Sequence, residues 1–380
     1  MPDTITKLDL IAVTVTPKTV WTFLRATSSS GLLGLGEATL TGQEDAIATA
    51  AHSAGASVIS QPIDGAEALF PQLPFSTLPE AAFSSALLQA IRDLEAQAKG
   101  VPVAGLLGGM QRAGIPVYAN INRRTLDRSP AGFAASVQDA LNAGHEAFKI
   151  APFDDLTPDL DISDARPLIA AGIARIEAVR DAIGQDKRLM VDCHWRFRPG
   201  WALDTLEALK PVGLHWFECP VPDTEEMIPD LLHIRTAANQ RGVLLAGLEQ
   251  SILRGGFTPF LEAGAFDVMM PDVKYAGGPD EMMRIAEDFA QAGVTFSPHN
   301  PSGPICHAHS LQVCAALPDL AVLETQFDET PLFDEVVGQE LPPSNEGAIS
   351  LSDSAPGIGV SLDQPVLDTL ETRILWHTGA

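Results

Sequence analysis

The chain contains no apolar stretch long enough to cross a membrane. A membrane helix needs about 18 consecutive apolar residues, and no run in this sequence approaches that length. The N-terminal segment MPDTITKLDL has neither a basic start nor an apolar core. We therefore expect no secretory signal, no membrane partner and a cytoplasmic location.

Cysteines and basic residues are scarce. The four cysteines have no C-x-x-C spacing, so we expect reduced thiols; they are Cys193, Cys219, Cys306 and Cys314. Lysine and arginine total 24 against 49 aspartates and glutamates, which gives a formal net charge of −25. This charge disfavours a nucleic-acid partner and says little more, because an acidic surface mainly keeps a protein soluble.

A glycine-rich dinucleotide fingerprint is also missing. No G-x-G-x-x-G follows a first apolar run, and polar residues end nearly every run instead of clustering at one switch point. Both observations argue against a doubly wound open sheet, which is the main structural alternative to a barrel. The chain does have 380 residues that are 46% hydrophobic, enough to bury a large core.

Eight short apolar runs follow one another through the middle and second half of the chain. Each is bounded by polar, glycine or proline residues, and the intervals carry helix-period sequence. Eight strands alternating with helices predict a closed α/β barrel of the TIM type. The runs are Val117–Asn122, Ala147–Pro152, Arg188–Cys193, Leu214–Pro220, Val243–Glu249, Phe266–Asp272, Val294–Asn300 and Leu320–Gln326.

The two ends of the chain differ from this pattern. Residues 1–112 read as an α+β module that begins with two alternating strands, 8–15 and 20–27. The segment 330–380 is rich in Pro, Gly, Asp and Ser with only short apolar runs, so it cannot form a core alone. We expect this segment to pack back on the N-terminal capping module, with the barrel in 113–329.

Six ionisable side chains lie at or near the ends of successive runs, roughly 25 residues apart, which is the length of one βα unit. In a parallel barrel all six would face one mouth. They are Asp192, Glu218, Glu249, Asp272, His299 and Glu324.

The first three of these are hard oxygen donors with apolar neighbours. Asp192, Glu218 and Glu249 would repel one another by several kcal/mol if they were buried together without a cation. We therefore predict that they bind Mg²⁺, which leaves open positions for substrate oxygens. The alternative is that each acid caps the next helix or pairs with a basic residue.

Four further residues could move protons or hold charge. His194 follows Asp192 by two residues, so strand alternation would place both on one face; a satisfied histidine at a strand end is the alternative. Asp272 and His299 could form a general base, the carboxylate holding one ring nitrogen and raising the basicity of the other. Lys149 could stabilise an oxyanion or act as a base, unless it is an ordinary surface lysine.

Together these motifs resemble the enolase superfamily, and within it the mandelate racemase subgroup. The resemblance implies a modified (β/α)₇β barrel with an α+β capping domain, and Mg²⁺-assisted removal of the proton α to a carboxylate to give an enediolate. The matching segments are GLLGLGEA (31–38), IRDLEAQAKGVPVAGLLGG (91–109), FKIA (148–151), VDCH (191–194), WFECPV (216–221), AGLE (246–249), MPDVKYAGG (270–278), SPHNPSGPI (297–305) and VLET (322–325).

The resemblance also implies a role for each site residue. The three acids would bind Mg²⁺, and Asp272 with His299 would form the base. Glu324 would donate a hydrogen bond to the substrate carboxylate, a role that requires a protonated carboxyl.

Departures from the racemase pattern favour one type of reaction over another. Ala151 stands where those racemases carry the second lysine of a Lys-x-Lys pair, whereas Asp192-x-His194 with PHNPSGPI resembles the galactonate dehydratase type of acid-sugar dehydratase. We expect His299 to take the α-proton and His194 to protonate the leaving β-hydroxyl of a small carboxylate substrate. The alternative is a racemase or epimerase of a hydroxy acid or of an amino-acid derivative such as a proline-like acid, with Lys149 or His194 as the second base.

The substrate end is specified less fully. The segment 15–21, between the first two strands, is shorter than the lid loop usual in this superfamily. We therefore expect an open site or one completed by another subunit of a homo-oligomer. Six residues are candidate substrate contacts at the rim, although each also fits a helix cap, a stacking residue or a surface charge: Asn120, Asn122, Arg123, Trp195, Arg196 and Lys274.

Overall fold

The barrel is built from eight parallel strands. The computed structural model describes residues 2–339, 341–352 and 355–379. Adjacent strands follow the order β10-β9-β8-β7-β6-β5-β4, and β11 pairs with the other edge of β4. Each predicted run overlaps one of these strands, and only β4 begins before its run: β4 (Gly114–Asn120), β5 (Ala147–Ile150), β6 (Arg188–Asp192), β7 (Trp216–Glu218), β8 (Leu244–Gly247), β9 (Val268–Met269), β10 (Thr295–Phe296) and β11 (Leu323–Gln326).

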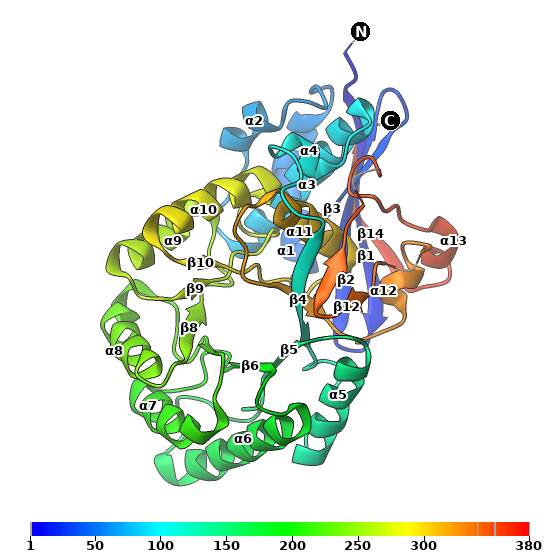
Figure 1. Ribbon diagram of the computed structural model, residues 1–380. Coiled ribbons are helices and arrows are strands. Elements are labelled where there is room, and N and C mark those ends of the chain that lie inside the picture. Colours follow the sequence, from blue (N-terminus) through cyan, green and yellow to red (C-terminus); the bar gives the residue numbers. More distant parts are fainter. Residues whose placement is uncertain (1, 340, 353–354, 380) are drawn as a thin grey trace.

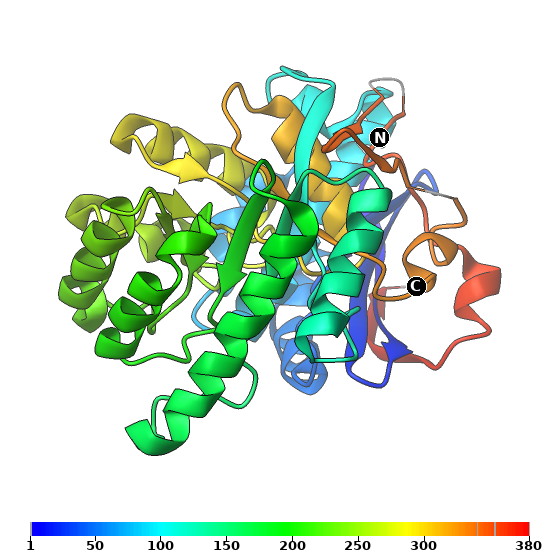
Figure 2. The ribbon, with the colours of Figure 1, turned by 60° about the horizontal axis from the view of Figure 1, so that its bottom comes forward.

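A helix follows each of the first seven strands, and these helices form the outer ring seen in Figure 1. The predicted (β/α)₇β architecture is therefore confirmed. The helices are α5 (Pro130–Asn142), α6 (Ile162–Ile183), α7 (Pro199–Ala208), α8 (Ile228–Asn239), α9 (Leu253–Ala263), α10 (Gly278–Ala292) and α11 (Pro304–Ala316). Figure 2 shows α5 and the longer α6 side by side on the outside of the barrel.

The seam between β10 and β11 is the weakest part of the wall, with no continuous ladder in the described strands. Two backbone hydrogen bonds still cross it, from Ala321 N to Phe296 O at 3.2 Å and from Glu324 N to Pro298 O at 3.4 Å. Buried side chains fill the barrel interior, among them Tyr118, Met190 and Trp216. The eight-stranded wall therefore surrounds a packed core.

The capping domain is an antiparallel sheet packed on one long helix. The sheet order is β14-β1-β2-β3, with β1 (Ile5–Thr16), β2 (Thr19–Ser28), β3 (Leu33–Glu37) and β14 (Thr372–Gly379). Only Pro17 and Lys18 separate β1 from β2, so the segment predicted to be shorter than the usual lid loop is a tight hairpin.

Helix α3 (Leu78–Lys99) lies between this sheet and the barrel. It begins with a capping box between Thr77 and Glu80 and ends at Gly100, which has a φ of 66°. All of its residues from Ala81 to Ala96 are buried, because both faces are covered. Helix α3 is thus the joint between the two domains.

The segment after β11 contacts both domains. Strand β14 pairs with β1 of the cap, whereas β13 (Ala348–Ser350) pairs with the start of β4 in the barrel. Residues 340, 353, 354 and 380 of the predicted 330–380 segment lie outside the described residues. We propose the domain division near residues 112 and 330 on the basis of these contacts.

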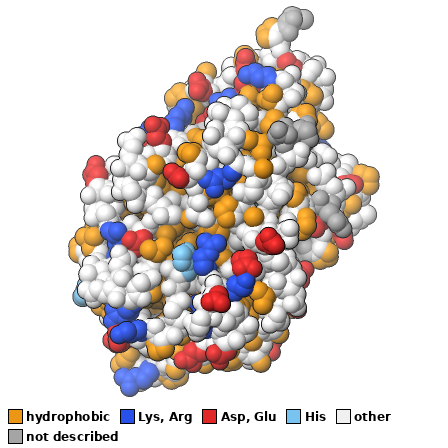
Figure 3. Space-filling view, viewed as in Figure 1, with side chains coloured by type: hydrophobic (Ala, Val, Ile, Leu, Met, Phe, Trp, Pro, Cys, Tyr) orange, Lys and Arg blue, Asp and Glu red, His pale blue; other side chains and the backbone are white. Residues whose placement is uncertain are grey.

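The remaining elements are short. They are α1 (Glu44–Ala54), η1 (Gly55–Val58), α2 (Ala66–Leu69), η2 (Phe70–Gln72), α4 (Val103–Leu106), η3 (Lys210–Val212), η4 (Glu225–Met227), α12 (Leu332–Glu335), β12 (Ser344–Asn345) and α13 (Gln364–Leu367). Among the described helices, none combines the length and the apolar character needed to cross a bilayer. Acidic and basic side chains are interspersed over the face shown in Figure 3.

Candidate active site

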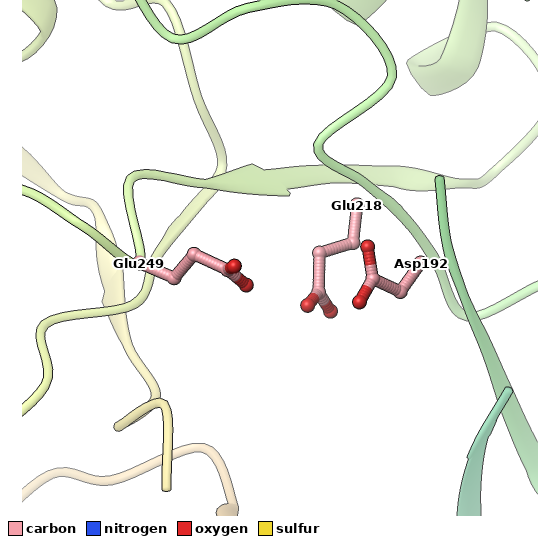
Figure 4. A group of neighbouring side chains, drawn as sticks. All are labelled: Asp192, Glu218 and Glu249. Atoms are coloured by element: carbon pink, nitrogen blue, oxygen red, sulfur yellow. The ribbon is translucent and has the colours of Figure 1, made fainter. Parts of the chain in front are cut away.

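Three acids from adjacent strands meet at the barrel mouth. Asp192 and Glu218 end β6 and β7, and Glu249 follows β8 by two residues. Each contributes one carboxylate oxygen to a group in which all three atoms lie within 4.8 Å of one another. Figure 4 shows the side chains pointing into one common space. The sequence prediction that these acids come together is confirmed.

The backbone beside these acids adopts a conformation that non-glycine residues rarely take. Positive φ angles occur at His194 (47°), Cys219 (43°) and Leu248 (71°), at a cost of about 1 to 2 kcal/mol each. The half-buried Asp223 carboxylate accepts hydrogen bonds from Leu248 N (2.9 Å) and from the Cys219 thiol (3.6 Å). Asp223 therefore ties the end of β7 to the end of β8, next to two of the acids.

The electrostatics of the acid cluster fit a divalent cation. Burial raises the pKa of Glu218; Lys149 opposes this shift, and the neighbouring acids reinforce it. Burial likewise raises the pKa of Glu249, whose Oε2 atom is buried and has no hydrogen-bond partner. Three hard oxygen donors, one of them with a buried oxygen that accepts no hydrogen bond, match the ligand set of Mg²⁺.

Lys149 is not a surface lysine. Its side chain is buried, and its Nζ atom lies 2.6 Å from Glu218 Oε1 and 3.0 Å from Glu324 Oε1. Burial alone would lower the pKa of this amine, but the two carboxylates raise it well above its ordinary value. Lys149 is thus a fixed cation, and the arrangement does not favour a role as a base.

Glu324 does not fit the expected protonated donor. Its carboxylate oxygens accept hydrogen bonds from Asn120 Nδ2 (2.7 Å) and Asn300 N (2.9 Å), and Lys149 adds a positive charge. Burial acts to raise the pKa of Glu324, but Lys149 and His299 together with these hydrogen bonds lower it to about 2. The expectation of a protonated Glu324 is wrong for this arrangement, because all the partners named here favour the anion.

The predicted base dyad is assembled. His299 Nδ1 lies 2.9 Å from Asp272 Oδ2, and Lys274 Nζ lies 3.2 Å from the same oxygen. Burial would lower the pKa of His299, but Glu249 and the bond to Asp272 raise it. The Nε2 atom of His299 is 3.4 Å from Glu249 Oε2, so the free ring nitrogen faces the acid cluster.

His194 reaches the site by a route different from the expected one. Strand β6 ends at Asp192, and the left-handed turn at His194 brings its Nε2 to 2.8 Å from Asp192 Oδ2. Asp192 is the main cause of the raised pKa of His194. The predicted proximity is confirmed, but strand alternation is not its cause.

A pocket of about 280 Å³ lies between the barrel mouth and the cap. Four of the six predicted rim residues line it: Asn120, Asn122, Arg123 and Lys274. Lys149, Asp192, His194, Glu249 and His299 line it as well. The sequence analysis missed six lining residues: Thr39, Leu40 and Thr41 from the cap, and Tyr275, Pro301 and Ser302 from the barrel loops.

Trp195 and Arg196 do not line this pocket, so its geometry does not support them as substrate contacts, and that role stays a prediction. Left-handed backbone at His194 and Trp195 turns the chain after Asp192. The Arg196 guanidinium instead donates to the carbonyls of Asp154 (2.8 Å) and Leu156 (3.1 Å). Arg196 thus fixes the loop after β5.

Two family models match this chain and agree with its fold. The model of the enolase C-terminal domain-like family matches residues 132–366. The model of the mandelate racemase/muconate lactonizing enzyme N-terminal domain matches residues 5–108. Together they cover both the capping domain and the barrel.

Curated relatives are named as sugar-acid dehydratases. A D-galactonate dehydratase of Variovorax paradoxus is 28% identical over 354 residues, 90% of this chain and 89% of that protein. A D-gluconate dehydratase of Thermoproteus tenax is 30% identical over 285 residues, 75% of this chain and 55% of that protein. These names agree with the predicted lyase class.

A solved structure supports the fold. The mandelate racemase/muconate lactonizing enzyme from Jannaschia sp. CCS1 superimposes with a TM-score of 0.84 at 24% identity, over 96% of this chain and 97% of that one. The chain therefore belongs to the mandelate racemase/muconate lactonizing enzyme family of the enolase superfamily.

Proposed function

We propose that the chain is a Mg²⁺-dependent dehydratase of a hydroxylated carboxylic acid of the sugar-acid type. The observation that carries this proposal is that two histidines, each bound to an aspartate, line one pocket beside the three-acid cluster. The dehydratases among its relatives support the same reaction class. β-Elimination needs one group that accepts a proton and another that donates one, and His299 and His194 supply these roles.

The acid cluster would hold the cation through Asp192, Glu218 and Glu249. When bound, Mg²⁺ supplies positive charge that makes the proton α to a carboxylate easier to remove. Lys149 adds a second, permanent charge, because its pairing with Glu218 and Glu324 keeps it protonated.

The base and the acid differ in their partners. Asp272 holds Nδ1 of His299, which leaves Nε2 to accept the substrate α-proton. Asp192 stabilises protonated His194, which can deliver its proton to the leaving β-hydroxyl. His299 gains one proton, His194 loses one, and water departs; the enol left behind tautomerises to a 2-keto-3-deoxy acid.

The direct test is a screen of sugar acids and proline-like acids with Mg²⁺ in D₂O. The proposal expects a keto acid, detectable with semicarbazide, from at least one sugar acid. Exchange and inversion at the α-carbon without keto-acid formation would contradict the dehydratase proposal. That outcome would identify a racemase or epimerase with His194 as its second base.

The His194→Asn variant tests the division of labour. Keto-acid formation should fall by about 10² to 10⁴-fold, because the leaving hydroxyl loses its proton donor. Exchange of the α-proton with D₂O should survive, since Asp272 and His299 are untouched. Equal loss of exchange and elimination would show that His194 has another role.

A further inference from the structure

Three separate sequence motifs meet at one contact between the cap and the barrel. GLLGLGEA forms β3, MPDVKYAGG forms the loop after β9, and SPHNPSGPI forms the loop after β10. The second and third motifs carry Asp272 and His299. The first belongs to the cap and contains neither a proposed metal ligand nor a proposed proton-transfer residue, yet its last strand residue, Glu37, is fully buried.

Glycines allow this close contact. A Cβ atom on Gly36 would lie 1.9 Å from the carbonyl oxygen of Ala86 in α3, so β3 can pack on α3 only without a side chain there. A Cβ atom on Gly303 would lie 2.9 Å from the Glu37 carboxylate. The glycines of the first and third motifs therefore permit one joint contact.

Glu37 caps a barrel helix from the capping domain. Its Oε1 accepts a hydrogen bond from Gly303 N (2.7 Å), and its Oε2 accepts one from Cys306 N (2.8 Å). These N–H groups lie at the start of α11, whose own N-cap residue has no side chain to bind them. A carboxylate at this position satisfies orphan donors and interacts favourably with the helix dipole. His299 lies four residues before Gly303.

Gln89 of α3 makes the matching contact with the other loop. Its Nε2 donates to Val273 O (3.3 Å), the carbonyl directly after Asp272. Its Oε1 accepts from Glu37 N (3.2 Å), so the same amide is also tied to β3. Ser85, one helical turn earlier, accepts a hydrogen bond from Gly277 N (3.1 Å). Side chains of the cap therefore make hydrogen bonds with both loops that carry the dyad residues.

We propose that Glu37 and Gln89 are positioning residues of the capping domain, which hold the His299 and Asp272 loops in the relative placement needed for proton abstraction. This inference rests on the proposed function, because it takes the dyad as the base. Neither residue lines the pocket. Glu37 Oε1 also accepts a hydrogen bond from Thr39 Oγ1 (2.6 Å), and Thr39 lines the pocket. The amide oxygen of a glutamine at this position can keep that bond, so the test below probes the effect that is exerted through the two loops.

The principal test is Glu37→Gln in the full-length protein loaded with Mg²⁺. The amide keeps the shape but cannot accept both backbone N–H groups as well as the carboxylate does. We expect kcat and the α-proton exchange rate to fall by roughly 10 to 100-fold, the scale of a small misplacement of a reacting group. KM and Mg²⁺ affinity should change by less than about twofold, because the pocket and the acid cluster are untouched.

The chain offers a matched control in Asp93. This buried carboxylate also accepts two backbone N–H groups, from Leu35 (2.9 Å) and Ile358 (3.0 Å), but it contacts neither dyad loop. Asp93→Asn should lower the melting temperature and leave kcat unchanged. If Asp93→Asn loses as much kcat as Glu37→Gln, Glu37 only stabilises the fold and the proposal is overturned.

A second variant and a measurement without substrate protect the test. Gln89→Leu should also reduce the α-proton exchange rate, and it replaces Glu37→Gln as the test if that variant folds poorly. In protein labelled with ¹⁵N-histidine, the His299 Nδ1–H signal, assigned by its absence in His299→Asn, should shift or broaden in either variant and stay unchanged in Asp93→Asn. An unchanged signal would overturn the positioning role. A shifted signal in a protein that exchanges no acid would reject the proposed function alone.

Discussion

The two halves of the barrel mouth balance their charges differently. On the side of β6 to β8, three buried carboxylates gather around one space, and Glu249 Oε2 has no hydrogen-bond partner. On the side of β9 to β11, Asp272 is bound by Lys274 and His299, and Glu324 by Lys149. In the second half each carboxylate contacts a lysine, whereas in the first half only Glu218 does, through the shared Lys149. Asp192 and Glu249 of the first half have histidines as their basic neighbours, and we propose that a cation binds on this side.

The largest expected effect comes from a substitution in the acid cluster on the side of β6 to β8. Glu249→Gln removes one of the three oxygen donors, so Mg²⁺ affinity should collapse and turnover should fall by on the order of 10⁴-fold. The melting temperature without Mg²⁺ should rise, because the substitution relieves repulsion between buried acids. Calorimetric titration with Mg²⁺ and thermal unfolding measure both effects. Unchanged Mg²⁺ affinity would remove the basis for the contrast.

A smaller effect is expected on the side of β9 to β11, which carries Asp272 and His299. His299→Asn should lower turnover by about 10³-fold, the scale of a lost general base, while Mg²⁺ binding survives because all three acids remain. Exposed His233 on α8 provides the control, and His233→Asn should be neutral. Turnover that persists in His299→Asn would reject the base assignment.

The smallest effect is a difference in pH dependence. Burial lowers the pKa of His307 and His309 in α11 to about 4. Their stabilising contribution is therefore complete above pH 6.5 and is lost as the pH falls toward 4, by up to about 3 kcal/mol each. Glu218 has a raised pKa, so without Mg²⁺ its contribution is present below pH 4.5 and is lost as the pH rises.

Melting temperatures with and without Mg²⁺ between pH 5 and pH 8 would resolve the two contributions. Stabilisation by Mg²⁺ should grow with pH, since the acids must be deprotonated to bind it. The part of the stability loss below pH 6.5 that comes from His307 and His309 should persist with a chelator present. Stabilisation by Mg²⁺ that does not depend on pH would contradict the assignment of the buried acids as its ligands.

The barrel and the acid cluster could be predicted because both depend on a simple repeat. An apolar run that ends in an acid places that acid at the mouth whatever its neighbours are, which is why Asp192, Glu218 and Glu249 come together. Strand ends were less predictable. Strand β9 covers only Val268–Met269, although the hydrogen bond from His299 N to Pro271 O (3.2 Å) continues strand-like pairing as far as the dyad.

Contacts between distant segments could not be predicted from the spacing of the sequence motifs. Thr39 and its neighbours reach the pocket only because the cap docks through α3. Lys149, from β5, lies against Glu324 and lowers the pKa of its carboxyl. Arg196 misses the pocket because two left-handed residues turn the chain. Each of these outcomes depends on a partner, whereas the sequence analysis judged residues one at a time.

The strained backbone at Leu248 lowers the folding stability of the protein. A branched, buried side chain with a φ of 71° immediately before Glu249 places a ligand at the expense of folding stability. Glycine would adopt that backbone without penalty. Variants that relax the backbone at this residue should therefore melt at a higher temperature and, because Glu249 would shift, bind the proposed cation less tightly.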